Sequence, residues 1–198
     1  MALAGGSRHL LFSSTSTVYR ASDADRLSED LPLVPLSPYA SSKVMVERVL
    51  ADVAATGAAD VCVLRYFNVA GADPGGRSGQ VSRAASHLVK IAAEAPIGKR
   101  DHVLVKGDDF ATPDGTGVRD YIHVSDLAAA HLAAVDALRA APHDGFTYNV
   151  GYSRSASVLD AVDRVTVEAL RRIMAPRRLG DVARLVADPT RIRAALAR

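Results

Sequence analysis

The chain has 198 residues, of which 48% are hydrophobic and 23% charged, with a formal net charge of +2. This composition is typical of a globular protein with a sizeable core, and the small charge gives no support for nucleic-acid binding. Cys62 is the only cysteine, which excludes an intramolecular disulfide. The first six residues predict neither a signal peptide nor a membrane span. We therefore expect a cytoplasmic protein.

Strand and helix patterns alternate through the first third of the chain. Residues 9–14 predict a short buried strand that runs into a polar loop. Ser37 is a good helix N-cap, Pro38 suits the first helical position, and the helix is expected from about Tyr39 to Thr56. Residues 61–67 are apolar except for Arg65, as expected for a strand that is buried on both faces of a parallel sheet.

The alternation continues through the rest of the chain, which predicts an α/β fold. Ser125 is a plausible cap for the second of three further helices. The expected segments are a glycine-rich loop at 71–79, helices at 81–95, 125–140 and 158–173, strands at 103–105 and 146–150, and a turn-rich segment at 111–117.

A tyrosine and a lysine lie four residues apart at the start of the first predicted helix. Tyr39 and Lys43 would therefore share one helical face. A lysine cation stabilises a nearby phenolate, which prepares a tyrosine to exchange a proton with a substrate hydroxyl. The alternative is a surface lysine beside a packed tyrosine.

Hydroxyl side chains follow the first predicted strand, at residues 13–17. Open α/β sheets bind ligands at the carboxyl ends of their strands, so a hydroxyl here could hydrogen-bond the substrate oxygen that the tyrosine deprotonates. The alternative is a capped turn, because serine and threonine often bond to nearby backbone groups.

The glycine-rich turn that receives a dinucleotide pyrophosphate does not occur in the sequence. A G-x-G-x-x-G pattern is missing, and residues 71–76 follow a strand but run into a loop. The pyrophosphate of a dinucleotide would therefore have no backbone amides of such a turn to receive it. The chain as written should be a poor enzyme with an exposed sheet edge.

Seven segments resemble those of UDP-glucose 4-epimerases, a family of extended short-chain dehydrogenases/reductases, in order and spacing. The segment at 114–124 is especially diagnostic of this family. Related 4,6-dehydratases typically carry an Asp-Glu pair where this chain has Ser14 and Thr15. The segments are FSSTSTVY, SPYASSK, LRYFNVAGA, DGTGVRDYIHVSDLA, YNVG, SVLDAV and PRRLGD.

The resemblance implies a role for each matching position. Tyr39 would be the catalytic base and acid, Lys43 would bind the nicotinamide ribose and tune Tyr39, and Thr15 would assist catalysis. Together with Phe67, these three residues would contact NAD. No metal site is implied. The substrate-binding positions are Thr15, Tyr39, Asn68, His87, Leu88, Val89, Leu104, Val105, Lys106, Arg119, Arg178 and Asp181.

Two of these positions are arginines that would hold a diphosphate, which suits their planar, permanently charged forks. The alternative for Arg119 is an ion pair with Asp120 or Asp126, and for Arg178 it is simple surface charge.

The sequence also departs from the family pattern in ways that affect fine substrate contacts. Arg20 replaces a common glycine, Lys106 stands where an aromatic residue is common, and Leu185 where some members have tyrosine.

The resemblance implies a partial Rossmann-type parallel sheet with a small C-terminal substrate-binding lobe. Members of the family begin with the glycine-rich turn and further βα units, so we expect that the front of the NAD-binding domain is missing. Residues 1–70 would be the C-terminal part of the NAD-binding domain, and residues 71–198 mainly the lobe with returning Rossmann elements. The implied reaction is reversible epimerisation at C4 of UDP-glucose and UDP-galactose, in galactose metabolism. The full-length protein would be a homodimer. An inactive or binding-only fragment, and an epimerase for UDP-N-acetylhexosamine or UDP-pentose, stay open as alternatives.

Overall fold

The computed structural model describes Gly6 and residues 8–20, 24–82, 87–140, 146–166 and 170–196. Two of the segments considered above lie partly outside this description. They are the N-terminal segment, in which residues 1–5 are not described, and the predicted helix at 81–95, in which residues 83–86 are not described. The elements are β1 (His9–Thr15), η2 (Ser16–Val18), α1 (Pro38–Ala55), β2 (Asp60–Tyr66), β3 (Asn68–Ala70), α2 (Leu88–Glu94), β4 (His102–Lys106), β5 (Val118–His123), α3 (Val124–Ala140), β6 (Phe146–Val150), β7 (Ser155–Ser157), α4 (Val158–Val165), β8 (Arg171–Ala175), β9 (Arg184–Leu185) and α5 (Thr190–Leu196).

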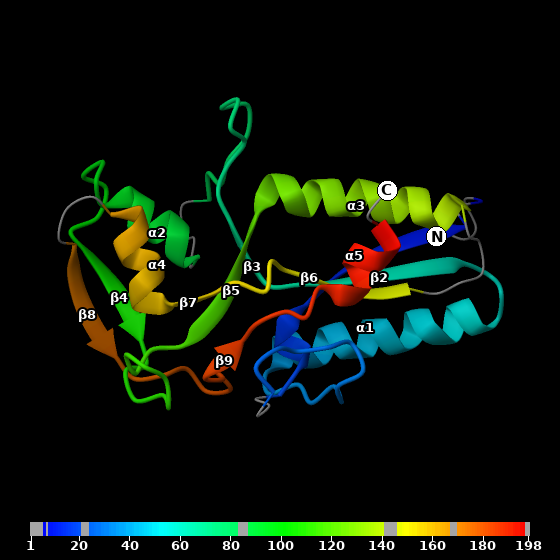
Figure 1. Ribbon diagram of the computed structural model, residues 1–198, viewed down its shortest axis with the longest axis horizontal. Coiled ribbons are helices and arrows are strands. Elements are labelled where there is room, and N and C mark those ends of the chain that lie inside the picture. Colours follow the sequence, from blue (N-terminus) through cyan, green and yellow to red (C-terminus); the bar gives the residue numbers. More distant parts are fainter. Residues whose placement is uncertain are drawn as a thin grey trace.

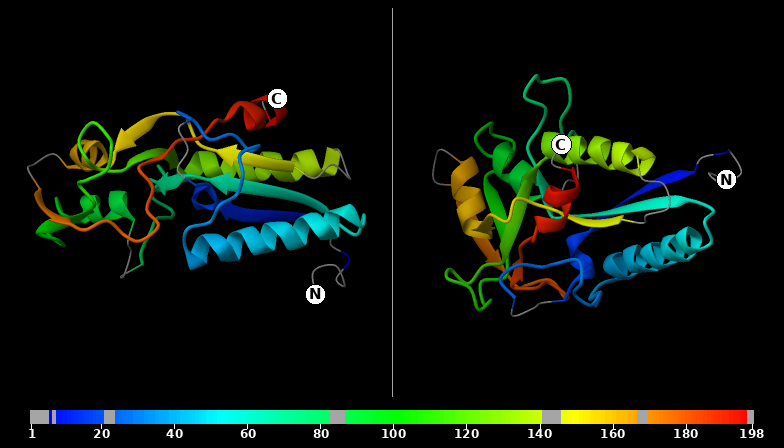
Figure 2. Two further views of the ribbon diagram at one scale, coloured as in Figure 1. Left: turned by 90° about the horizontal axis from the view of Figure 1, so that it is seen from below. Right: turned by 45° about the vertical axis from the view of Figure 1, so that its right-hand side comes forward.

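A three-stranded parallel sheet in the order β1-β2-β6 forms the larger part of the molecule. α1 packs on one face of this sheet and α3 on the other, as Figures 1 and 2 show. The central strand β2 is buried along nearly its whole length, which explains the apolar run at residues 61–64, and Arg65 is the charged exception within the predicted run. This confirms the predicted α/β class. Among the described strands, β1 pairs on one side only and forms an edge.

The sequence features at the ends of α1 act as predicted. The Ser37 hydroxyl accepts a hydrogen bond from Ala40 N at 3.2 Å, and Pro38 occupies the first turn. The helix ends at Ala55, and Gly57 follows with a φ of 72°, a left-handed conformation that glycine adopts without strain.

A second group of elements forms a small lobe at the other end of the molecule (Figure 1). β5 pairs with β3, β7 and β9, and connects the main sheet to the parallel pair β4-β8. α2 packs against α4, and Val103, Val105 and Val162 form the lobe's core with Leu88 and Ile91 packed against them. The chain then returns to the main sheet, where α5 packs on β6 and α3.

Three local predictions are wrong. Residues 81–82 are not helical, and α2 begins only at Leu88. The predicted helix at 158–173 ends at Val165, and residues 171–175 form β8 because they pair with β4. Ser125 is not the cap of α3, because the helix begins at Val124 and Ser125 lies inside its first turn, where its backbone N–H donates to the His123 ring nitrogen Nδ1 at 3.2 Å.

Of the helices within the described ranges, none is both long and apolar enough to cross a membrane.

Candidate active site

Lys43 is fixed at the carboxyl end of β1. Its Nζ donates a hydrogen bond to the carbonyl oxygen of Ser13 at 2.9 Å, and it lies 4.9 Å from the centroid of the Phe12 ring. The same ammonium lies 5.7 Å from the centroid of the Tyr39 ring, one helical turn earlier on α1. The Tyr39 side chain is 54% exposed. The predicted pairing of a phenol with a lysine cation on one helical face is therefore present, and the phenol can be reached from solvent.

Thr15 ends β1 and caps the short helix η2. Its hydroxyl accepts a hydrogen bond from Thr17 N at 3.2 Å and lies 3.1 Å from the Thr17 hydroxyl. The capped-turn interpretation of this segment is thus confirmed. A hydroxyl that accepts from a backbone N–H keeps its own hydrogen and can still donate to a ligand oxygen, so the catalytic role stays a prediction.

Arg119 lies on β5 and is half-buried. Its Nη1 donates to the carbonyl oxygens of Val118 at 2.9 Å and Ala183 at 3.4 Å. A Cβ on Gly117 would lie 2.9 Å from the guanidinium nitrogens, so the glycine leaves room for this side chain. Burial lowers the pKa of Arg119, and the charge of Asp181 only partly opposes this effect. An incompletely compensated cation of this kind suits an anionic ligand.

The alternative of an ion pair from Arg119 to Asp120 or Asp126 does not occur in the described structure. Asp120 faces away from Arg119, because neighbouring residues of a strand point to opposite faces. Its buried carboxylate accepts backbone hydrogen bonds from Tyr152, Ser153 and Ala187 at 3.0, 2.8 and 3.2 Å. Asp126 instead accepts a hydrogen bond from the Tyr152 hydroxyl.

Tyr121 shares the Arg119 face of β5 and was not singled out from the sequence. Burial raises its pKa to about 12, with Arg119 acting in the opposite direction. In the sheet register the predicted substrate residue Asn68 of β3 lies opposite Tyr121, and Arg119 is two positions earlier on β5. The period-two pattern of the segment would have identified Tyr121, had a strand been predicted there.

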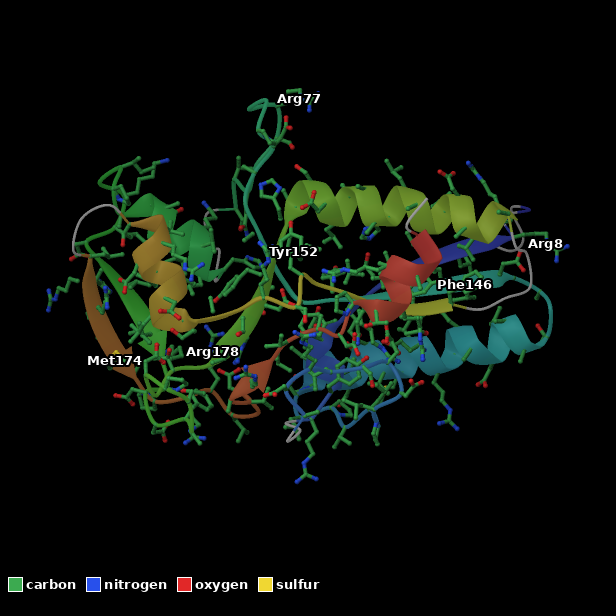
Figure 3. The ribbon with its side chains drawn as sticks, viewed as in Figure 1. Arg8, Arg77, Phe146, Tyr152, Met174 and Arg178 are labelled. Carbon is green, nitrogen blue, oxygen red and sulfur yellow. The ribbon has the colours of Figure 1, made fainter. Side chains whose placement is uncertain are left out.

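Arg178 lies in the loop between β8 and β9 (Figure 3). It is exposed, and none of the described carboxylates pairs with it. A turn hydrogen bond from Asp181 N to Arg178 O, at 3.1 Å, joins the two predicted ligand residues. The neighbouring Arg177 differs, because it forms an ion pair with Asp109 at 2.6 Å. Arg178 is therefore available to a ligand, and Arg177 is already paired.

The remaining predicted residues are spread over the lobe and the junction. Phe67 is buried between β2 and β3 among apolar side chains, so only its backbone can contribute directly to a ligand site. The Val105 side chain is also buried, in the core of the lobe, whereas Leu104 is exposed. His87, Leu88 and Val89 lie at the start of α2, Lys106 ends β4, and the His87 ring bonds to Gln80 at 2.7 Å.

The structure thus brings the predicted residues into two groups. One comprises Thr15, Tyr39 and Lys43, at the end of β1 and the start of α1, and the other is distributed over the lobe and its junction with the main sheet, with Arg119 on β5. No hydrogen bond or ion pair of the described residues joins the two groups. The described residues also include no cluster of three His, Cys, Asp or Glu side chains that could hold a metal ion.

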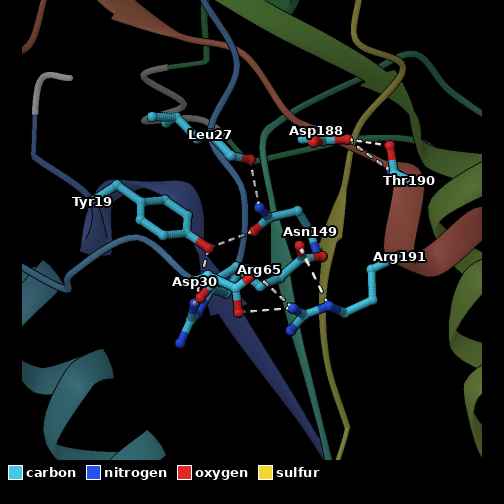
Figure 4. Close-up of polar contacts among 9 residues, drawn as sticks. Tyr19, Leu27, Asp30, Arg65, Asn149, Asp188, Thr190 and Arg191 are labelled. Carbon is cyan, nitrogen blue, oxygen red and sulfur yellow. Dashed lines mark hydrogen bonds and ion pairs between the residues drawn. The ribbon is translucent and has the colours of Figure 1, made fainter. Parts of the chain in front are cut away.

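A buried polar network lies directly behind the first group, and it was missed at the sequence level. The Tyr19 hydroxyl donates to Asn149 Oδ1 at 2.8 Å, and Asn149 Nδ2 donates to Leu27 O at 2.7 Å (Figure 4). Arg65 donates to the same Tyr19 hydroxyl at 2.8 Å and binds Glu47 of α1. Glu47 follows Lys43 by four residues, which is the only signal in the sequence that could have identified it.

Comparison of the sequence and the structure with those of known proteins identifies similar proteins. A family model described as the NAD dependent epimerase/dehydratase family matches residues 1–151. UDP-glucose 4-epimerase of Azospirillum brasilense is 46% identical over 194 residues, which make up 96% of this chain and 56% of the relative. The chain therefore spans a little over half the length of the curated relatives it matches.

Solved structures show the same likeness. UDP-glucose 4-epimerase of Bifidobacterium longum in complex with NAD+ and UDP superposes with a TM-score of 0.93 at 34% identity, over 99% of this chain and 60% of that one. The enzyme of Stenotrophomonas maltophila with bound NAD and formylated UDP-arabinopyranose has a TM-score of 0.91 at 37% identity, with the same shares covered.

Proposed function

The chain belongs to the NAD dependent epimerase/dehydratase family, and we propose that it supplies the catalytic and UDP-binding residues of an NAD-dependent UDP-glucose 4-epimerase. The observation that carries the proposal is the position of the Lys43 ammonium. It is held by Ser13 O and lies beside the Tyr39 ring at the carboxyl end of β1. This is where open α/β sheets bind their ligands.

The chemistry of this group fits the ribose end of NAD. An ammonium has three donors, and Lys43 uses one of them for Ser13 O, so two can bind ribose hydroxyls. Among the described residues no carboxylate forms an ion pair with Lys43 and competes for them. NAD, when bound, supplies the acceptor and later the donor of the hydride at the sugar carbon.

In the proposed reaction Tyr39 takes the proton of the 4-hydroxyl while C4 is oxidised, which gives a 4-keto sugar. Lys43 stabilises the phenolate form of Tyr39, and the Thr15 hydroxyl donates a hydrogen bond to the reacting oxygen. Tyr39 returns the proton when C4 is reduced from its other face. Interconversion of UDP-glucose and UDP-galactose, and with it a place in galactose metabolism and in the cytoplasm, follows as a prediction.

The second group is proposed to bind UDP. The incompletely compensated charge of Arg119 and the exposed Arg178 supply guanidinium forks for the diphosphate. Asn68 and Asp181 are proposed to contact the sugar and the uridine ribose. Residues 87–89 and 104–106 are proposed to line the nucleotide, Val105 through its backbone.

We also propose that the whole protein is a homodimer. α1 exposes Met45 and Val49, which are 67% and 60% accessible and lie about one helical turn apart. Exposed apolar side chains on the outer face of a helix favour association with a second copy. Light scattering of the purified protein measures this directly.

The decisive experiment places residues 1–198 in the matching part of the Azospirillum brasilense relative and assays conversion of UDP-galactose. Turnover that is lost in Tyr39→Phe supports the proposal. A folded chimaera that binds UDP without turnover would instead leave only a binding function. Turnover of UDP-N-acetylgalactosamine or UDP-arabinose in preference to UDP-galactose would change the substrate.

A further inference from the structure

A buried ion pair joins the helix that carries Tyr39 and Lys43 to the sheet beneath it. The Glu47 and Arg65 side chains are 7% and 8% exposed. Arg65 Nη2 donates to Glu47 Oε2 at 2.6 Å, and its Nε lies 3.1 and 3.2 Å from the two carboxylate oxygens. Glu47 also accepts a hydrogen bond from the hydroxyl of Ser14. The carboxylate is therefore held from two neighbouring strands, since Ser14 lies opposite Arg65 in the sheet register.

Arg65 also forms a hydrogen bond on the side away from Glu47. Its Nη1 donates to the Tyr19 hydroxyl, which donates in turn to Asn149 of β6 (Figure 4). Burial raises the pKa of Tyr19, so its phenol keeps the proton that it donates to Asn149. Each of these polar side chains has a partner, and the network links α1 to all three strands of the main sheet.

The polar network is related to Tyr39 and Lys43 by the spacing of the side chains that attach α1 to β1. Tyr39, Lys43 and Glu47 are separated by four residues each and so lie along one face of α1. Lys43 bonds to Ser13 O and Glu47 to the Ser14 hydroxyl. These two hydrogen bonds, one helical turn apart, fix both the rotation and the axial position of α1 relative to the end of β1. Thr15 is the residue that follows Ser14 on this strand.

Stability alone does not account for an ion pair at this place. The free-energy cost of removing two charges from water is about as large as the free energy gained from their attraction. A packed apolar pair therefore often stabilises a fold equally well. A charged pair with directional hydrogen bonds does specify one arrangement of the elements that it joins. We propose that Glu47, acting through Ser14 and Arg65, is a positioning residue that aligns Tyr39 and Lys43 with Thr15; this rests on the proposed epimerase function.

Kinetics of the chimaera test the proposal. Glu47→Gln keeps the size of the side chain but removes the charge that orients Ser14 and Arg65. We expect kcat to fall on the order of 10²-fold, the scale of a misplacement of about 1 Å, with KM for UDP-galactose almost unchanged. Ser14→Ala should lower kcat in the same direction, and the double variant should lose little more than Glu47→Gln alone.

Asp52→Asn is the matched control, because Asp52 is an exposed carboxylate on the same helix. It should leave kcat unchanged. A merely structural role for Glu47 predicts a different result, in which kcat falls only in proportion to the fraction of folded protein that binds UDP. That result, or an unchanged kcat in Glu47→Gln, would overturn the proposal.

A second measurement does not depend on turnover. In the purified chain labelled with 15N-lysine, the hydrogen-bonded Lys43 ammonium should give a protected Nζ signal. Glu47→Gln should shift or abolish this signal and Asp52→Asn should preserve it; an unchanged signal in both refutes positioning. If the unsubstituted chimaera has no turnover, the epimerase proposal fails and this signal decides the positioning proposal alone. Should Glu47→Gln not fold, Ser14→Ala, which removes a single hydroxyl, is measured in its place with the same two outcomes.

Discussion

Lys43 of α1 donates a 2.9 Å hydrogen bond to the carbonyl oxygen of Ser13, the residue that lies two positions before Thr15 on β1. This contact joins the helix that carries Tyr39 to the strand end that carries Thr15, although Ser13 and Lys43 are 30 positions apart in the sequence. The same ammonium lies 4.9 Å from the centroid of the Phe12 ring and 5.7 Å from that of the Tyr39 ring. The proposed proton transfer by Tyr39 depends on this arrangement.

Removal of either proposed diphosphate ligand should weaken UDP binding. Arg119→Ala and Arg178→Ala should each cost about 1.5–3 kcal/mol, because each arginine would lose charged hydrogen bonds to the diphosphate. Calorimetric titration of the purified chain with UDP measures the change. Arg177→Ala is the control, since Arg177 is already paired with Asp109. Unchanged affinity in both Arg119→Ala and Arg178→Ala would exclude the assignment.

Asp120→Asn should destabilise the junction between the sheet and the lobe. The buried carboxylate accepts three backbone hydrogen bonds, and an amide retains only one accepting oxygen. We expect the free energy of unfolding in urea to fall by about 1–3 kcal/mol. Asp136→Asn, a change of an exposed aspartate on α3, should have almost no effect. Equal stabilities of the two variants would show that the Asp120 contacts contribute nothing.

Acid should weaken the end of α2, the helix that begins beside the proposed nucleotide contacts. Hydrogen bonds from Lys90 and then Arg100 lower the pKa of Glu94 from its ordinary 4.5 to about 2. Because the folded-state pKa is the lower one, this contribution to stability is complete above about pH 4.5 and is lost as the pH falls toward 2.

Urea unfolding of wild type and Glu94→Gln across that pH range measures the effect. The glutamine variant cannot titrate at this position, so its stability should fall less steeply with decreasing pH. Parallel pH profiles for the two proteins would refute the linkage.

Local signals in the sequence predicted the parts of the fold that depend on nearby residues. Ser37 and Pro38 identify the start of α1, and the apolar run at residues 61–64 identifies β2. Residues 171–173 were predicted as the end of a helix but belong to β8, because their strand form depends on pairing with β4, 69 positions earlier in the register. Long-range pairing of this kind leaves no local pattern.

In the candidate site, too, the relationships between nearby residues could be predicted from the sequence, and those that depend on long-range packing could not. The spacing of Tyr39 and Lys43 is a helical relationship, which the sequence displays directly. The isolation of Arg119 from Asp120 could not be predicted, because the segment was not assigned to a strand and the alternation of its side chains was therefore not considered. The pairing of Glu47 with Arg65 depends on how α1 packs on β2, and only the structure reveals it.

The central claim is that Tyr39 is the catalytic base of a UDP-sugar epimerase, and the turnover of Tyr39→Phe in the chimaera tests it most directly. The variant loses only the hydroxyl that exchanges the proton, so kcat should fall roughly 10²–10⁴-fold while UDP binding and the unfolding temperature stay unchanged. Tyr148→Phe, a change in the core on β6, serves as the matched control and should retain turnover. A Tyr39→Phe chimaera with near-normal conversion of UDP-galactose would contradict the account.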